Sequence, residues 1–138
     1  MFLRDLTTCC RYKIDINSMQ EAAGVLVGEH DFSAFRGSQC QSLSPVRTMH
    51  SIYIQRNGDF VFITFKANAF LHHMVRNIVG SLLEIGLSKQ KPRWLEDVLL
   101  AKDRRYAGVM APPNGLYLAD VIYPEPYIFP DAPFPFNF

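Results

Sequence analysis

The chain has 138 residues and a formal net charge of +1; 49% of its residues are hydrophobic and 20% are charged. This composition is typical of one globular domain with a substantial core, and it excludes a disordered chain. The small net charge gives no overall electrostatic case for nucleic-acid binding, although a local basic patch is compatible with it.

Cysteine use and polarity predict a cytoplasmic protein. Cys9, Cys10 and Cys40 have neither the number nor the spacing of a disulfide framework or a zinc site, which indicates a reducing compartment. The N-terminus carries Asp5 and lacks the sustained apolar run of a signal peptide. The apolar stretch 70–87 approaches membrane length, but its polar residues argue against a membrane span. They are His72, His73, Arg76, Asn77 and Glu84.

The first predicted helix begins at Asn17 or Ser18, either of which can cap it, and runs to about Val27. Gly28 is expected to end it. The next residues, 29–45, are predicted to form an ordered loop with little regular structure.

Two strands are predicted at 46–56 and 59–67, where β-branched and aromatic residues dominate. Asn57-Gly58 between them is the strongest short hairpin signal. In the second strand, alternate residues form two faces that are both largely apolar, so helices should cover at least one of them. One face holds Val61, Ile63, Phe65 and Ala67; the other holds Phe60, Phe62, Thr64 and Lys66.

The main helix is predicted over 70–87, where apolar residues recur at helical spacing. A second stripe on this helix carries Arg76 and, one turn later, Gly80. A glycine inside a helix costs about 1 kcal/mol relative to alanine, so it suits a place where another backbone or a ligand comes close. Arg76 lies on a mostly apolar surface and needs a partner there.

The rest of the chain is predicted to contain one more helix and one more strand. Pro92 suits the first turn of a helix over 92–102, and residues 103–114 form a loop. Alternation predicts a strand over 115–123. The tail 124–138 is rich in proline and aromatic residues and is expected to wrap an apolar surface in extended form.

Several of these segments resemble the C-terminal half of the bacterial tRNA pseudouridine synthase A family. The longest matching motif is Lys-Ala-Asn-Ala-Phe-Leu-His-His-Met-Val-Arg-Asn-Ile-Val-Gly at 66–80. Shorter matches are Gly-Glu-His-Asp-Phe-Ser-Ala-Phe-Arg at 28–36, Gln-Cys-Gln-Ser at 39–42, Ala-Lys-Asp-Arg at 101–104 and Gly-Leu-Tyr-Leu at 115–118. The resemblance covers most of this chain but about half of a family member.

The resemblance implies an α+β fold, namely the C-terminal part of the pseudouridine synthase fold, with helices packed on a mainly antiparallel sheet. Residues 14–123 would form this domain, while 1–13 match nothing clearly and 124–138 form the tail. It also implies a homodimer that works without metal or organic cofactor.

Family members isomerise uridine to pseudouridine at positions 38–40, in the anticodon arm of tRNA. The resemblance implies that an aspartate in an Arg-Thr-Asp-x-Gly motif attacks, and that this motif and an active-site tyrosine belong to the N-terminal half. No aspartate of this chain follows Arg-Thr. The isolated chain is therefore predicted to be inactive, with the N-terminal half as a partner in trans.

The resemblance also assigns roles to residues of this chain. Arg76 matches the arginine that pairs with the catalytic aspartate and keeps it ionised. Leu116 matches the position that packs on the target base. Phe35, Arg36 and Gln39 lie in a loop near the RNA and the cleft.

Each assignment has a plainer alternative. Arg76 would ordinarily be a surface residue in a salt bridge, Leu116 a strand core residue, and Arg36 and Gln39 solvated loop residues. The pair of histidines at 72 and 73 points in two directions on a helix and is a poor metal chelate. We therefore interpret His73 as a core or RNA-facing residue and group it with the substrate-binding positions.

Two alternative functions remain open for the chain as a whole. One is a non-catalytic fragment that binds RNA or dimerises, and the other is a degraded gene remnant without a stable product. A sheet cut in the middle exposes an edge, which predicts weak stability and a tendency to associate.

Overall fold

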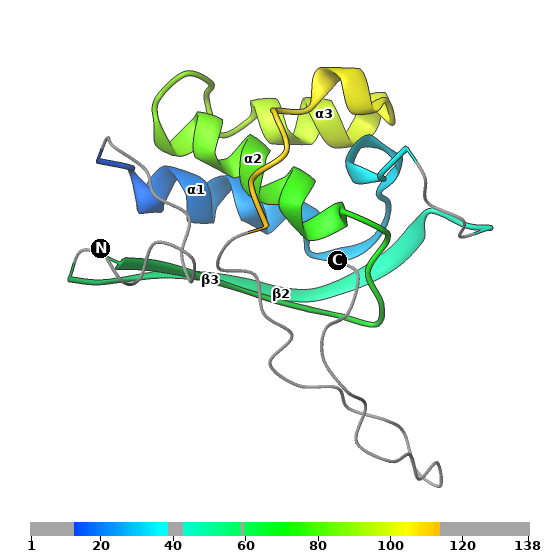
Figure 1. The fold of residues 1–138 in the computed structure, drawn as a ribbon, viewed down its shortest axis with the longest axis horizontal. Helices are drawn as coiled ribbons and strands as arrows, with labels where there is room; N and C mark the ends of the chain where they lie inside the picture. Colours follow the sequence, from blue (N-terminus) through cyan, green and yellow to red (C-terminus); the bar gives the residue numbers. More distant parts are fainter. Residues whose placement is uncertain (1–12, 39–42, 59, 114–138) are drawn as a thin grey trace, which may run out of the picture.

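The computed structural model describes residues 13–38, 43–58 and 60–113, and in these ranges it has an α+β fold. Three strands form one antiparallel sheet in the order β1-β2-β3: β1 (Gly28–Asp31), β2 (Val46–Asn57) and β3 (Phe60–Ala67). Three α-helices are stacked on one side of the sheet (Figure 1): α1 (Ile16–Ala23), α2 (Met74–Gly86) and α3 (Trp94–Ala101). Two short 3-10 helices, η1 (Gly24–Leu26) and η2 (Ser33–Phe35), lie on either side of β1 in the chain, and a third, η3 (Arg104–Tyr106), follows α3. The predicted fold class is confirmed.

The β2–β3 hairpin follows the prediction closely. Gly58 in its turn has φ +62°, a conformation that glycine adopts without strain. The face of β3 that contains Val61, Ile63 and Phe65 packs toward the helices, where Ile52 and Ile54 of β2 are buried. The opposite face keeps large side chains exposed, so the helices cover one face of the hairpin. The exposed side chains on the opposite face are Tyr53, Phe60 and Phe62.

A glutamine side chain protects part of the β2 edge. Because β1 pairs only with the first residues of β2, no strand among the described residues pairs with the rest of β2 on that side. There Gln20 of α1 donates from Nε2 to the Ile52 carbonyl at 2.9 Å and accepts from the Ile54 amide at 2.8 Å. The amide thus replaces a neighbouring strand and satisfies two backbone groups.

The prediction of a loop over 29–45 is wrong in part, because this stretch contains most of β1 and all of η2. Gly28 does not end the first helix; it begins β1, with φ +109°. The pairing of β1 with β2 overrides the low strand propensity of Gly-Glu-His-Asp. The cap of α1 is Asp15 rather than Asn17 or Ser18, since its carboxylate accepts from both of their amides.

The main helix is shorter than predicted, because α2 starts at Met74 rather than at residue 70. His73 precedes it with φ +62°, a left-handed conformation that cannot continue a helix. The prediction of 92–102 as a helix is confirmed within two residues at each end. The predicted strand 115–123 and the tail 124–138 lie outside the described residues. No helix in the described ranges has the length and apolarity needed to cross a bilayer.

Candidate active site

The start of α2 is fixed by hydrogen bonds to the segment that contains η2. The Gly37 amide donates to the His72 carbonyl at 2.8 Å, and buried Asn77 donates from Nδ2 to the Phe35 carbonyl at 2.8 Å. The backbones lie so close that a Cβ on Gly37 would stand 2.8 Å from the His72 carbonyl oxygen. The segment around Arg36 and the first turn of α2 therefore form one unit.

Arg76 occupies the third position of α2 and is half-buried. Its Nε donates to the Ala111 carbonyl at 2.9 Å, while the Ala111 amide donates back to the Arg76 carbonyl at 3.0 Å. Within the described ranges, no acidic side chain lies within ion-pair distance of Arg76. The guanidinium is thus held through one nitrogen, and its terminal nitrogens remain available to a ligand or a carboxylate.

Two glycines allow the segment before Ala111 to lie directly on α2. A Cβ on Gly80 would stand 1.8 Å from the Val109 carbonyl oxygen, and a Cβ on Gly108 would stand 3.0 Å from the Gly80 carbonyl oxygen. The Gly108 amide donates to the buried hydroxyl of Ser81 at 2.9 Å. This close approach agrees with the predicted reason for a glycine inside the helix, and it brings Ala111 to Arg76.

The two adjacent histidines stack on each other beside this arginine, with ring centroids 3.7 Å apart and an interplanar angle of 26°. Partial burial lowers the pKa of His73, and repulsion from His72 and from Arg76 adds to the effect. His72 Nδ1 is buried and has no hydrogen-bond partner in the described part of the chain. Within the same residues, no group of three or more potential metal ligands forms a metal site.

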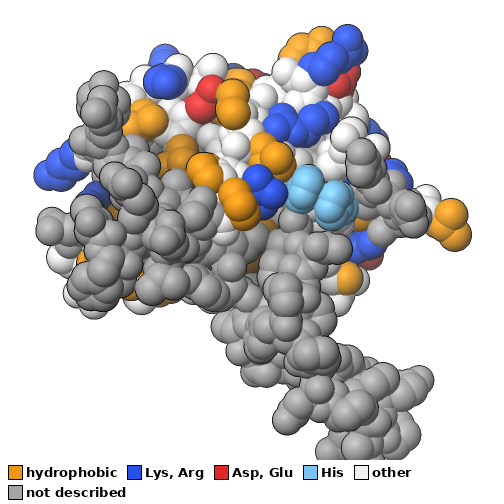
Figure 2. Space-filling view, in the orientation of Figure 1, with side chains coloured by type: hydrophobic (Ala, Val, Ile, Leu, Met, Phe, Trp, Pro, Cys, Tyr) orange, Lys and Arg blue, Asp and Glu red, His pale blue; other side chains and the backbone are white. Residues whose placement is uncertain are grey.

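Basic side chains border this region. In Figure 2, histidine side chains lie next to Lys or Arg side chains on the visible face. Lys102 lies 4.0 Å from Asp31. Burial acts to raise the pKa of Asp31, but hydrogen bonds from Ser33 and the charges of Lys102 and Arg36 together hold that pKa below its usual value. Burial lowers the pKa of Arg104, and no ion pair of Arg104 occurs among the residues that the structure describes. The border is therefore suited to an anionic ligand.

The structure brings together four of the six residues that the sequence predicts for the site. His73 and Arg76 lie together at the start of α2, and the backbone on either side of Arg36 is hydrogen-bonded to that helix start, whereas the Phe35 ring is fully buried. Phe35 therefore supports the loop through its carbonyl, and this placement favours a positioning role over direct contact with substrate. Gln39 and Leu116 lie outside the described residues.

Three residues that position the site were not singled out from the sequence. Asn77 and Gly37 join η2 to α2, and Ala111 holds Arg76. Asn77 carried a usable signal, because a polar residue among apolar ones on a helix is buried only with a partner. The contact of Ala111 carried none, since the two residues are 35 positions apart.

Comparisons with known proteins identify the family of the chain. The family model described as tRNA pseudouridine synthase matches residues 22–124. A protein of Colwellia psychrerythraea named tRNA pseudouridine synthase A is 53% identical over 123 residues, which is 89% of this chain and 48% of that protein.

Proteins with the same name from two other bacteria are similarly close. That of Shewanella denitrificans is 56% identical over 117 residues, covering 85% of this chain and 45% of its own length. That of Idiomarina loihiensis is 54% identical over 120 residues, covering 87% and 46%. The chain spans about half the length of these curated relatives, and it belongs to the tRNA pseudouridine synthase family.

Proposed function

We propose that this chain supplies one wall of the active site of a tRNA pseudouridine synthase, which isomerises uridine in the anticodon arm of tRNA in the cytoplasm. The observation that carries the proposal is the state of Arg76. It is half-buried and held through Nε, and no acidic partner lies within ion-pair distance among the described residues. A half-buried cation in this state is costly unless a carboxylate completes it.

The proposed partner of Arg76 is the catalytic aspartate of the segment that corresponds to the rest of the relatives' length. The arginine would favour the ionised form of that aspartate and fix its orientation, which makes it a competent nucleophile. The reaction breaks the bond between ribose C1′ and uracil N1, turns the base, and joins C1′ to uracil C5. C5 loses its proton and N1 gains one, so substrate and product are isomers. In the proposed mechanism the aspartate is the nucleophile, and neither a metal nor an organic cofactor takes part.

The surface next to Arg76 is proposed to receive the RNA. Arg36 and His73 adjoin it, and Gln39 and Leu116 are proposed to contact the nucleotide from residues outside the described ranges. A neutral His73 fits this role, because burial and its neighbours lower its pKa and so disfavour a further charge beside Arg76. The complete enzyme is proposed to be a homodimer, as the resemblance to the family implies.

The test is reconstitution with a separately expressed N-terminal half of the Colwellia psychrerythraea relative. We expect pseudouridine in unmodified tRNA from the mixture and none from this chain alone. Arg76→Ala should abolish turnover, and Arg76→Lys should lower it strongly, because lysine cannot form a forked contact with a carboxylate. Lys66→Ala removes an exposed cation elsewhere and should leave turnover unchanged.

Three results would contradict the proposal or a part of it. Turnover by this chain alone would show that the aspartate need not come from another segment. Unchanged turnover of Arg76→Ala in an active mixture would remove Arg76 from the active site. If the mixture does not associate, the proposed partnership in trans is wrong.

A non-catalytic, self-associating chain is the second candidate, and the exposed aromatic residues on the outer face of the hairpin favour it. Tyr53, Phe60 and Phe62 are 59%, 41% and 49% exposed, which is unusual for neighbouring large side chains on a monomer. Sedimentation velocity over a range of concentrations distinguishes the two candidates when it is combined with the reconstitution assay. A concentration-dependent dimer without turnover in the mixture supports this second candidate.

A further inference from the structure

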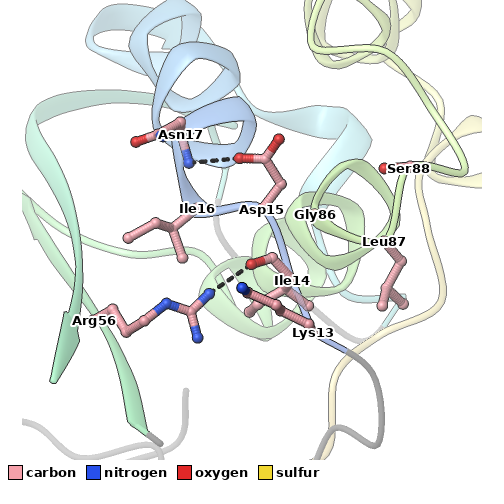
Figure 3. A pocket seen from close by; sticks show the side chains of 9 residues that line it. All are labelled: Lys13, Ile14, Asp15, Ile16, Asn17, Arg56, Gly86, Leu87 and Ser88. Atoms are coloured by element: carbon pink, nitrogen blue, oxygen red, sulfur yellow. Dashed lines mark hydrogen bonds between the residues drawn. The ribbon is translucent and has the colours of Figure 1, made fainter. Parts of the chain in front are cut away.

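The end of the molecule around the C-terminus of α2 carries a second concentration of positive charge. Two shallow hollows meet there at Ser88, with volumes of about 400 and 670 Å³. Figure 3 shows the first, in which Arg56 and Lys13 lie on the same side. We name the cations around the two hollows the basic ridge. It consists of Lys13, Arg56, Lys89, Lys91 and Arg93.

The charges of the basic ridge are not neutralised within the described residues, where none of its cations forms an ion pair. The acids that line the hollows are Asp15 and Asp97, so cations outnumber acids. Hydrogen bonds from Ser18 and Asn17 hold Asp15 as the cap of α1 and lower its pKa, so it keeps its negative charge but is fixed at that helix end. A surface with such an excess of cations around shallow hollows suits an extended polyanion.

The turn that carries the two lysines is fixed by the backbone. Ser88 has φ +63°, an uncommon conformation for a residue other than glycine, and its amide donates to the Ile85 carbonyl at 3.0 Å. The amides of Lys89 and Gln90 both donate to the Glu84 carbonyl, at 2.9 and 3.3 Å. The lysine side chains are exposed, but their backbone positions are already set before a ligand arrives.

The basic ridge is well separated from Arg76. With a rise of about 1.5 Å per residue, Ser88 lies roughly 18 Å from Arg76 along the axis of α2. A nucleotide bound at Arg76 cannot reach the ridge, whereas an RNA of the size of tRNA spans both. Lysines contact phosphates as point charges and carry no sequence information, which suits a contact that positions the substrate.

We infer that the basic ridge binds the phosphodiester backbone of the tRNA outside the nucleotide that is modified. This inference rests on the proposed function for the identity of the ligand. It does not rest on catalysis, because the ridge acts on RNA binding by this chain alone.

The test measures the affinity of the chain for unmodified tRNA between about 50 and 200 mM salt, without any second component. A protein that neutralises phosphates loses affinity linearly on a logarithmic salt scale, with a slope set by the number of contacts. For Lys89→Ala/Lys91→Ala we expect weaker binding and a slope that is smaller by about 2, or about 1 for each lysine.

Two controls match this variant. Gln90→Ala changes the residue between the two lysines without changing charge, and Lys66→Ala removes a lysine from β3. Both should keep the salt slope and affinity of the original chain, and thermal melting should show all variants folded.

Several outcomes overturn the inference. They are no tRNA binding by the original chain at the lowest salt concentration, an unchanged slope in the double variant, or an equal change of slope in Lys66→Ala. If the double variant binds polyglutamate more weakly than the original chain does but binds tRNA equally well, the ridge would be assigned to an acidic polypeptide instead. Failure here leaves the reconstitution test of Arg76 unaffected, so the inference and the proposed function fail separately.

Discussion

Replacing Gly80 by alanine tests the contact that brings Ala111 to Arg76. The new Cβ would stand 1.8 Å from the Val109 carbonyl oxygen, while ordinary contact begins at 3.4 Å, so the two backbones must separate by about 1.6 Å. A shift of this size breaks both hydrogen bonds between Arg76 and Ala111. They contribute about 3 kcal/mol together, roughly 1 for the neutral bond and 2 for the charged one.

The helix itself gains from the same substitution, because alanine is favoured over glycine by about 1 kcal/mol. The net loss should therefore be about 2 kcal/mol of unfolding free energy, or roughly 6 °C in Tm for a chain of this size. Urea unfolding and thermal melting by circular dichroism measure both quantities.

Gly24→Ala is the matched control for Gly80→Ala. Gly24 has φ −57°, and no atom lies within 4 Å of the position that a Cβ would take there, so alanine should be neutral or stabilising by about 0.4–1 kcal/mol. If Gly80→Ala melts at or above the temperature of the original chain, the segment 108–111 does not pack on α2 as described. The account of how Arg76 is held would then be wrong.

Two further predictions concern the sheet edge and the histidine pair. Gln20→Leu leaves the Ile52 carbonyl and the Ile54 amide without their partner, so the free energy of unfolding in urea should fall by about 1–3 kcal/mol. The exposed control Gln90→Ala should change it little. Equal stability of the two variants would refute the role of Gln20. Because the pKa of His73 is lowered in the folded chain, the unfolded chain binds more protons below about pH 6.5, so stability should fall as the pH decreases through that value. Asparagine tolerates the left-handed backbone, so His73→Asn should reduce the pH dependence of stability measured by urea unfolding between about pH 5 and pH 8. An unchanged pH dependence in this variant would exclude His73 as its source.

The sequence predicts the elements that depend on local pattern. The hairpin is visible in the alternation of β2 and β3 and in Asn57-Gly58, and the body of α2 is visible in its apolar spacing. Asp15 was missed as the cap of α1 because Asn17 and Ser18 are equally good capping residues and stand close to it in the sequence.

Elements that depend on distant partners are not visible in the sequence. The four residues of β1 become a strand because β2 lies beside them. The start of α2 is set by His73, whose left-handed backbone is only weakly favoured by its residue type and is not signalled by the apolar spacing. In the candidate site, the motif identified Arg76, but the residue that holds it, Ala111, has a small apolar side chain and acts through its backbone.

The hydrogen bond from Arg76 Nε to the Ala111 carbonyl also limits the direction from which a carboxylate can approach. A guanidinium offers two forked edges, one formed by Nε and a terminal nitrogen and the other by the two terminal nitrogens. The first edge is occupied by Ala111 at 2.9 Å. An aspartate that makes a forked contact must therefore meet the arginine end-on, along the extension of its side chain, and cannot lie alongside it.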